Sequence, residues 1–345
     1  MRIAIHKNDN IFKHYSQWTD TWVEFCENNE IDYEIIDCYS LDILEKLKEF
    51  DILLWHFGNY VLQDMLFARS ILYSAKNLGL KVFPDFNDSW HFDDKIAETY
   101  ALQSVKAPLP RSWMFYTLND LMKWVNTNNE FPLVAKLRTG SGSHNVVLIK
   151  HRSQLIKYGR KMFSNGFSPV PSFGYKATSN FKSSKNWADI KRRIKKIPEF
   201  LHTLSRAKQF PNEKNYVYLQ EFLPNDGFDL KIVVIGDKLS YICRNIRKGE
   251  FRASGGGDLF FDKSLVTKDI IKSAFETNNK LGLKCMGYDY VVDKRTNKGI
   301  MVEMSYGFSH TALIQAGGYW NKEMKWENEP LNAPEEIIKN MLEIQ

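Results

Sequence analysis

Short apolar runs alternate with longer amphipathic segments at the start of the chain. The apolar runs lie at residues 2–6, 33–37, 51–56 and 80–84, and the segments 18–29, 41–50 and 64–79 lie between them. In these segments apolar residues recur three and four positions apart, which is the period of an amphipathic helix. Strand alternating with helix predicts a parallel sheet with helices on its faces. We therefore expect an α/β domain over residues 1–90.

The pattern changes after this domain. A helix is predicted at 96–105, followed by a strand, a helix, a hairpin over 131–150 and a helix at 151–162. From residue 216 the chain is rich in β-formers, with strands predicted at 216–223, 230–236, 238–245, 286–292 and 299–305, and helices at 265–281 and 334–343. This mixture predicts an α+β C-terminal lobe. The expected division is 1–90, 91–215 with an insertion over 164–210, and 216–345.

The hairpin segment FPLVAKLRTGSGSHNVVLIK, residues 131–150, places Lys136 at the end of an apolar strand. A phosphate-binding loop of the P-loop or dinucleotide type would lead from a strand into a helix, whereas this loop leads into a second strand. A glycine-rich loop can bring its backbone N–H groups close to phosphate oxygens. Most lysines are simply solubilising, but this one is carried by a rigid strand next to such a loop.

Two carboxylates lie in neighbouring predicted strands. Asp289 is followed by Tyr290-Val291-Val292, Glu303 is preceded by Ile300-Met301-Val302, and a polar turn joins the two strands. An antiparallel pair would place both acids near one end of a sheet, which is costly for buried like charges unless a cation lies between them. Such oxygens suit Mg²⁺. The alternative is that both acids are solvated residues at a strand edge.

Composition and charge narrow the class of protein. The 345 residues are 43% hydrophobic and 14% aromatic, which excludes a disordered chain. A net charge of +6 favours anionic ligands without demanding nucleic acid, which we expect not to be a partner. Eight basic residues and one acid lie between 176 and 198. This segment is either a docking surface for an anionic substrate or polymer, or a solvated face, and the second reading is the more common.

Four cysteines lie far apart with no CxxC pair, so neither a disulfide framework nor a zinc site is indicated. The N-terminus lacks an apolar segment typical of a signal peptide, and no stretch approaches the roughly 20 apolar residues of a membrane span. We expect a cytoplasmic protein.

Five motifs in order resemble those of the ATP-grasp superfamily. They are Asp94-Lys95, PLVAKLRTGSGSHNVVLI, LQEFLPNDGFDLKIVVIGD, GEFRASGGG, and GYDYVV with VEMSYGF. The resemblance covers about residues 91 to 310 and is nearest to the branch of ribosomal-protein glutamate ligases and glutathione synthetase-like enzymes. It implies an N-terminal parallel-sheet domain followed by a two-lobed ATP-grasp fold, with the glycine loop as a lid over ATP.

The resemblance also implies roles for individual residues. Those implied to bind the nucleotide are Lys95, Lys136, Gly140, Ser141, Gly142, Ser143, Glu221, Phe222, Asp229 and Ser254. Glu221 and Phe222 would border adenine, and Asp229 would bind the ribose hydroxyls. Catalytic roles are implied for Arg244, Arg252 and Lys231. Asp289, Glu303 and Ser305 would bind Mg²⁺, for which Mn²⁺ is a substitute.

The chain departs from the family pattern at three positions. Ser305 stands where an asparagine is usual, and a serine hydroxyl is a poorer magnesium ligand than an amide oxygen. Lys231 stands where close relatives have an arginine, which replaces a planar fork by a point charge. His144 lies in the lid loop, where a small residue is common.

The implied chemistry is carboxylate–amine ligation through an acylphosphate. The substrates would be a small-molecule carboxylate and an amine, or an acceptor on an anionic polymer or carrier, and a homodimer is left open. The segment 176–197, Tyr319-Trp320 and His310 are our candidates for recognising the second substrate, although a lone histidine is more often structural. Three alternatives remain: an ATP-grasp kinase acting on an alcohol, a binding protein without turnover, and a polyanion-binding module regulated by ATP.

Overall fold

The chain forms two compact units in the computed structural model, which describes residues 1–7, 13–59, 61–140, 145–169, 210–246 and 258–344. The first unit comprises Met1–Pro110 together with Leu223–Gln345, and the second comprises Arg111–Phe222. The predicted domain boundary at 90 falls inside the first unit and the boundary at 215 falls inside the second. The three-domain division therefore stays a prediction.

A parallel four-stranded sheet opens the first unit, as the sequence predicted. Its order is β2-β1-β3-β4. The strands are β1 (Ile3–His6), β2 (Tyr33–Ile36), β3 (Ile52–Leu54) and β4 (Lys81–Phe83), and the connecting helices are α1 (Lys13–Asn28), α2 (Ile43–Leu47) and α3 (Leu62–Asn77). Every residue of β1 and β3 is buried, which explains why these strands are continuous apolar runs in the sequence.

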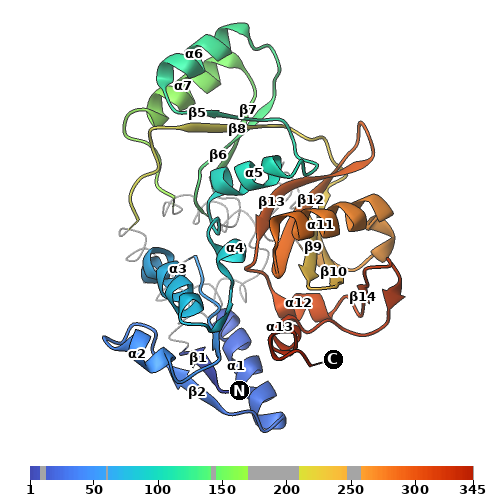
Figure 1. Ribbon diagram of the computed structural model, residues 1–345. Helices are drawn as coiled ribbons and strands as arrows, with labels where there is room; N and C mark the ends of the chain where they lie inside the picture. The colour runs from blue at the N-terminus through green and yellow to red at the C-terminus, as the bar shows by residue number, and fades with distance from the viewer. Residues whose placement is uncertain (8–12, 60, 141–144, 170–209, 247–257, 345) are drawn as a thin grey trace, which may run out of the picture. The chain divides into compact units, whose positions relative to one another are not determined.

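The first unit also contains an antiparallel seven-stranded sheet, with the order β13-β12-β9-β10-β14-β15 and β11 paired with β10 (Figure 1). Its strands are β9 (Phe228–Ile235), β10 (Lys238–Asn245), β11 (Leu259–Phe260), β12 (Cys285–Asp293), β13 (Lys298–Ser305), β14 (Tyr319–Trp320) and β15 (Trp326–Glu327). The α/β character of the N-terminal part and the α+β character of the C-terminal part are both confirmed.

Helices complete the first unit, and α5 packs along the edge strand β13. They are α4 (Phe86–Ser89), α5 (Lys95–Ser104), α11 (Lys268–Leu281), α12 (His310–Ile314) and α13 (Ala333–Leu342), with a 3-10 turn at Lys263–Leu265. Trp22 of α1 donates a hydrogen bond to the carbonyl oxygen of Pro334 at 3.0 Å. One hydrophobic core thus includes residues of both sheets of this unit.

Tyr319 and Trp320 are part of this core, so the prediction that they recognise a substrate is not supported by their position. Tyr319 and Trp320 are 9% and 8% exposed, and the Trp320 ring lies 4.6 Å from that of Trp326 on the neighbouring strand. A strand of two residues is too short to produce a period in the sequence, which is why β14 was not predicted.

The second unit is an antiparallel sheet with the order β5-β8-β6-β7 and two helices. The strands are β5 (Ser112–Phe115), β6 (Leu133–Lys136), β7 (Val146–Ile149) and β8 (Val217–Glu221), and the helices are α6 (Leu118–Thr127) and α7 (Arg152–Met162). The helices pack together (Figure 1), and a Cβ added at Gly159 would lie 2.2 Å from Leu121. The predicted hairpin is confirmed, with Leu133 opposite Ile149 and Lys136 opposite Val146.

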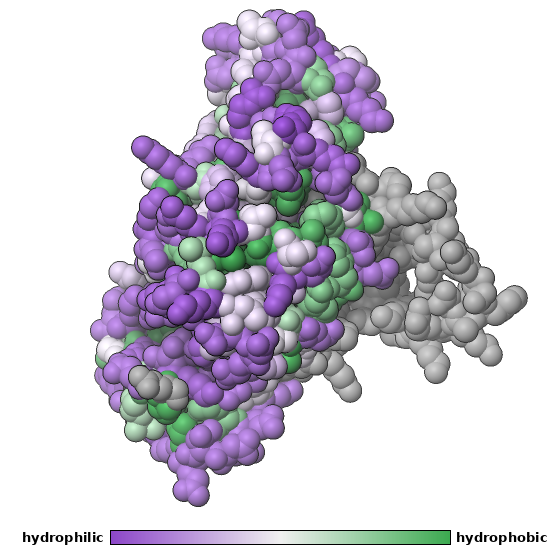
Figure 2. Space-filling model, turned by 90° about the vertical axis from the view of Figure 1, so that its right-hand side faces the viewer, coloured by the Kyte–Doolittle hydropathy of each residue, from purple (hydrophilic) through white to green (hydrophobic). Residues whose placement is uncertain are grey.

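Hydrophilic residues cover most of the face drawn in Figure 2, with smaller hydrophobic areas between them. The longest helices in the described part of the chain, α1 and α3, have 16 residues each. No helix in that part combines the length and the apolar character needed to cross a bilayer.

Candidate functional site

The register of the antiparallel sheet brings three of the predicted site residues together. Asp289 on β12 lies opposite Lys231 on β9 and, on its other side, opposite Glu303 on β13. The predicted adjacency of Asp289 and Glu303 is therefore confirmed. A shift in the ladder follows directly, between Asp289 and Tyr290, at a place where irregular pairing commonly redirects side chains.

Asp289 is held by two cationic side chains. Its Oδ1 lies 2.6 Å from the Nζ of Lys231, and its Oδ2 lies 3.1 Å from a guanidinium nitrogen of Arg244. Burial by itself raises the pKa of Asp289, but Arg244 and Lys231 outweigh this effect, so the pKa lies below its ordinary value. Asp289 is consequently ionised and paired.

Arg244 also binds the second aspartate of the network. Its Nε lies 3.1 Å from one oxygen of Asp229, and its terminal nitrogen contacts the other. Asp229 has no exposed surface, and burial raises the pKa of this carboxyl, an effect that Arg244 opposes. The ribose-binding role predicted for Asp229 stays a prediction.

Lys95 reaches the last carboxylate of the group. Asp94 accepts hydrogen bonds from the backbone N–H groups of Ile96 and Ala97 and so caps α5, which fixes Lys95 at the first helical position. The Nζ of Lys95 lies 3.2 Å from Oε1 of Glu303. Burial lowers the pKa of Lys95, but Glu303 and the other nearby acids raise it by a larger amount. The net shift of the pKa is therefore upward.

Glu98 is a site residue that the sequence analysis missed. It lies one turn after Lys95 on α5 and is 3% exposed. Burial raises its pKa well above the ordinary value, and the charge of Glu303 raises it more. A glutamate inside a helical pattern gives no signal of its own, because only packing against β13 reveals that it is buried.

Ser305 uses its hydroxyl group locally. The hydroxyl accepts a hydrogen bond from the backbone N–H of Gly307 at 3.1 Å and donates one to the carbonyl oxygen of Gly307 at 3.2 Å. Opposite Ser305 lies Gly287, where an added Cβ would be 3.6 Å from the Nζ of Lys231. The predicted metal-binding role of Ser305 stays a prediction.

In the second unit, Lys136 ends β6 and is 8% exposed. The loop that follows is fixed at its base by Glu213, whose Oε1 accepts hydrogen bonds from Arg138 at 3.1 Å and Thr139 at 2.8 Å. Gly140 has a φ of 109°, and an added Cβ would lie 3.1 Å from the side chain of Asn145. The loop therefore requires glycine at this position. Glu213 was not predicted, because it lies outside every motif.

Glu221, at the end of β8, accepts a hydrogen bond from the Nε of Arg111 at 3.1 Å, and Phe222 is half-buried beside it. Their proposed contact with adenine is untested by this geometry. Several predicted residues lie outside the described ranges: Ser141, Gly142, Ser143, His144, Arg252, Ser254 and the basic segment 176–197.

Comparison with protein-family models and with curated protein sequences finds no match. Solved structures do match. D-alanine–D-alanine ligase from Bacillus anthracis, complexed with ATP, gives a TM-score of 0.55 at 13% identity over 99% of this chain and 97% of that chain. N5-carboxyaminoimidazole ribonucleotide synthetase from Thermotoga maritima gives 0.55 at 13% identity, over 100% and 76%.

A third similar structure is the biotin carboxylase domain of 2-oxoglutarate carboxylase from Hydrogenobacter thermophilus, in complex with MgADP. It gives a TM-score of 0.58 at 10% identity, over 99% of this chain and 69% of that chain. The chain has the ATP-grasp fold. At such low identity the similarity concerns the ATP-grasp fold alone, and the branch predicted from the motifs stays a prediction.

The ATP-grasp fold implies a divalent cation, and the donor chemistry fits it. Asp289 and Glu303 supply carboxylate oxygens from adjacent strands, which are ligands that Mg²⁺ accepts. Within the described ranges no three histidine, cysteine, aspartate or glutamate side chains form a ready-made metal site. Lys231, Arg244 and Lys95 instead contact these oxygens. A metal ion bound there would share these oxygens with the ammonium and guanidinium groups or displace them.

His310, the predicted substrate ligand, lies in the core of the first unit. It is 5% exposed, and its ring lies 5.6 Å from that of Trp18. Burial lowers its pKa to about 4, so the imidazole is neutral at physiological pH. This position favours the structural alternative that the sequence left open.

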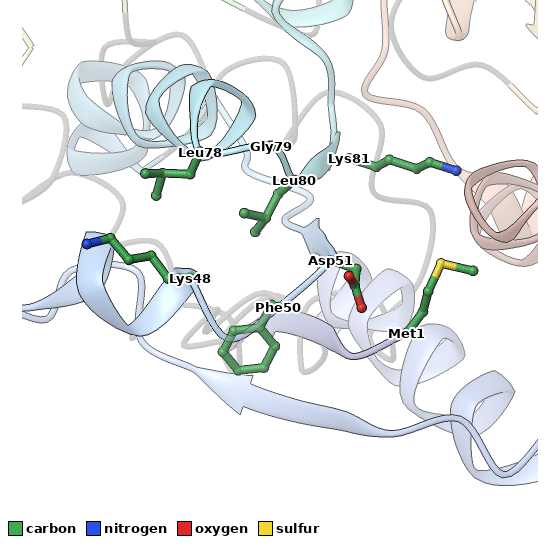
Figure 3. A pocket seen from close by; sticks show the side chains of 8 residues that line it. All are labelled: Met1, Lys48, Phe50, Asp51, Leu78, Gly79, Leu80 and Lys81. Carbon is green, nitrogen blue, oxygen red and sulfur yellow. The ribbon is translucent and has the colours of Figure 1, made fainter.

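A pocket of about 360 Å³ lies at the amino-terminal edge of the parallel sheet (Figure 3). None of the residues that line it belongs to β12 or β13. It is lined by Met1, Lys48, Phe50, Asp51, Leu78, Gly79, Leu80 and Lys81. Lys48 contacts both oxygens of Glu45, and Lys81 contacts Glu343 and the carbonyl oxygen of Met341. Because these charges are matched within the protein, the pocket does not resemble an anion site.

Proposed function

We propose that this protein is an ATP-dependent carboxylate–amine ligase. The observation that carries the proposal is the buried charge network on the antiparallel sheet of an ATP-grasp fold, in which Asp289 lies beside Glu303 and is contacted by Lys231 and Arg244. The similar structures support it, because they are described as a ligase, a synthetase and a carboxylase. Burying these charges costs desolvation free energy that apolar side chains in the same place would not require, so a role in ligand binding would explain the network.

In the proposed reaction, an oxygen of the substrate carboxylate attacks the γ-phosphorus of ATP, and the bond to the β-phosphate oxygen breaks. The products are an acylphosphate and ADP. The nitrogen of an amine then attacks the acyl carbon and loses a proton, and inorganic phosphate leaves. The protein needs no covalent nucleophile, so its task is to hold anionic groups together despite their repulsion.

Cationic side chains of the chain would perform this task. Lys95 and Lys136 would bind phosphate oxygens, and Arg244 and Lys231 would stabilise the anionic groups that react. Bound magnesium would supply further neutralisation of the triphosphate, with Asp289 and Glu303 as its protein ligands, and Mn²⁺ would substitute for it. Arg244 is well suited because its fork already bridges two carboxylates.

We expect the partners to be small molecules, a carboxylate and an amine, or an acceptor on a larger anionic carrier. Self-association belongs to the same proposal, since one of the similar structures is described as a dimer. Size measurement of the purified protein would test this part.

The proposal is tested by screening amino acids and other carboxylates with ATP while ADP and phosphate are both measured, with mass spectrometry of any product. We expect ADP and phosphate in equal amounts and a product heavier than the carboxylate by the amine minus water. The substitutions Lys136→Ala, Asp289→Asn and Glu303→Gln should each lower turnover at least about 100-fold, because each removes a charge aimed at phosphate or metal.

Unchanged secondary structure and melting temperature of the three variants would show that the loss is local. ADP without phosphate would indicate a kinase that phosphorylates an alcohol. Parental turnover in all three variants at saturating substrate would show that the assigned site is wrong.

A further inference from the structure

Glu98 is a buried carboxylate that belongs to none of the sequence motifs. In the described part of the chain its carboxylate has one hydrogen-bond donor, the backbone N–H of Met304, at the long distance of 3.4 Å. No side chain in that part of the chain donates a hydrogen bond to it. Burying a carboxylate with so weak a partner is costly, so the position calls for a reason beyond packing.

Lys95 is the cation next to Glu98. The two residues are three positions apart on α5 and therefore share one face of the helix. Three acids act electrostatically on the single ammonium group of Lys95, namely Glu303, Asp93 and Glu98. With all of them ionised the group carries a net charge of −2, from three negative charges and one positive charge.

The proposed function gives Glu303 a second role besides its contact with Lys95. In this structure Glu303 holds Lys95 at 3.2 Å, whereas in the working enzyme it would bind a divalent cation. A metal ion on Glu303 repels a neighbouring ammonium group, so the pairing of Lys95 with Glu303 would weaken at the moment when Lys95 is needed for the phosphates. Glu98 lies on the same helix face and could then hold the ammonium group more strongly.

We propose that Glu98 is a positioning residue that takes over Lys95 when Glu303 binds the divalent cation. An ammonium group has three N–H donors, so Lys95 can bind the carboxylate of Glu98 and a phosphate oxygen at once. The inference rests on the proposed function and deepens it. It assigns Glu98 to nucleotide binding through Lys95, without contact between Glu98 and the nucleotide.

The test is the affinity for the non-hydrolysable β,γ-imido analogue of ATP, measured by calorimetry on the full chain with and without Mg²⁺. Glu98→Gln removes the ionisable group and keeps an oxygen acceptor for Met304. With Mg²⁺ we expect the Kd of this variant to rise about tenfold, the size of one charge-assisted hydrogen bond. Without Mg²⁺ it should change less than about twofold, because Glu303 still holds Lys95.

A double-mutant cycle separates positioning from other roles. In the background of Lys95→Met, the substitution Glu98→Gln should change the Kd less than about twofold under both conditions, since Glu98 then has no ammonium group to hold. A tenfold effect that persists without Lys95 would overturn the inference, because Glu98 would then act on the metal or on the fold. An unchanged Kd for Glu98→Gln alone would overturn it as well.

Asp88 provides a matched control within the same unit. It is a fully buried carboxylate that accepts hydrogen bonds from the backbone N–H groups of Lys284 and Cys285. Asp88→Asn makes the same chemical change and should leave the Kd at the parental value. If Glu98→Gln does not fold, Glu98→Asp is measured in its place. We expect a smaller rise in Kd for this variant, and an unchanged Kd would contradict the inference.

The two proposals fail in different ways. If the parental protein shows no Mg²⁺-dependent affinity for the analogue, the proposed function is wrong and the inference falls with it. If the parental affinity depends on Mg²⁺ and Glu98→Gln behaves like the parent, only the inference is wrong.

Discussion

Asp229 has no exposed surface, and both of its carboxylate oxygens accept hydrogen bonds from Arg244. Arg244 also contacts Asp289, so one guanidinium group serves two acids. Removing one partner of a buried ion pair is strongly destabilising, because it leaves the other charge buried without compensation. The stability of this sheet and its chemistry therefore depend on the same side chain.

We predict that Arg244→Met lowers the free energy of unfolding by about 3 to 5 kcal/mol. The measurement is urea unfolding of the parent and the variant at neutral pH. Arg295→Met is the matched control, because Arg295 also binds an aspartate, Asp293, but its side chain is 48% exposed.

The control should cost less than about 1 kcal/mol, since an exposed pair contributes little. Equal losses in Arg244→Met and Arg295→Met would show that burial of the Arg244 network is energetically irrelevant.

At the scale of elements, the short helix α4 is joined to the start of β12 by a buried carboxylate. Oδ1 of Asp88 accepts hydrogen bonds from Lys284 and Cys285 at 2.9 and 3.3 Å. Burial raises the pKa of Asp88 from 3.8 to about 7. Between these two pH values the folded protein keeps a proton that the unfolded chain has released.

This shift has a defined consequence for stability. The contribution of Asp88 is fully present below the unfolded pKa and is lost as the pH rises through the folded pKa, over the range from about 4 to about 7. Asp88→Asn removes the titrating proton and keeps the acceptor. We predict that the variant gains stability relative to the parent as the pH rises from 5 to 8, measured by urea unfolding.

The expected difference grows by at most about 1.4 kcal/mol for each pH unit, the value for one proton. A constant difference between Asp88→Asn and the parent across this range would contradict the raised pKa.

At the scale of the whole chain, three histidines with buried ring nitrogens affect stability in the opposite direction. Burial lowers the pKa of His56 to about 3 and of His91 and His310 to about 4. All three belong to the first unit. Because their folded pKa values are depressed, their contribution is present above the unfolded pKa of about 6.5 and is lost as the pH falls through the folded values.

We predict that the first unit loses stability on acidification below about pH 6.5, as the unfolded chain binds protons that the folded chain does not accept. His310→Asn should make this loss shallower by up to about 1.4 kcal/mol for each pH unit, the share of one histidine. Urea unfolding between pH 4.5 and 7 measures it. An identical pH dependence in the parent and in His310→Asn would show that His310 protonates as readily in the folded protein as in the unfolded chain.

The sequence by itself determined most of the elements and pointed to most of the residues of the candidate site. The alternation of apolar runs with amphipathic segments predicted the parallel sheet, and the apolar strands around Asp289 and Glu303 predicted that these acids lie on adjacent strands. Local periodicity suffices for this, because strand and helix place side chains at fixed intervals. The hairpin that carries Lys136 was predicted in the same way.

Only the tertiary structure decided which charges meet. Lys231 reaches Asp289, Arg244 bridges Asp229 and Asp289, and Glu98 becomes buried, because strands and helices distant in sequence pack together. The burial of Tyr319, Trp320 and His310 was decided in the same way. Periodicity shows which face of an element is apolar, but the neighbours of a polar side chain depend on register and packing, which residues far along the chain determine.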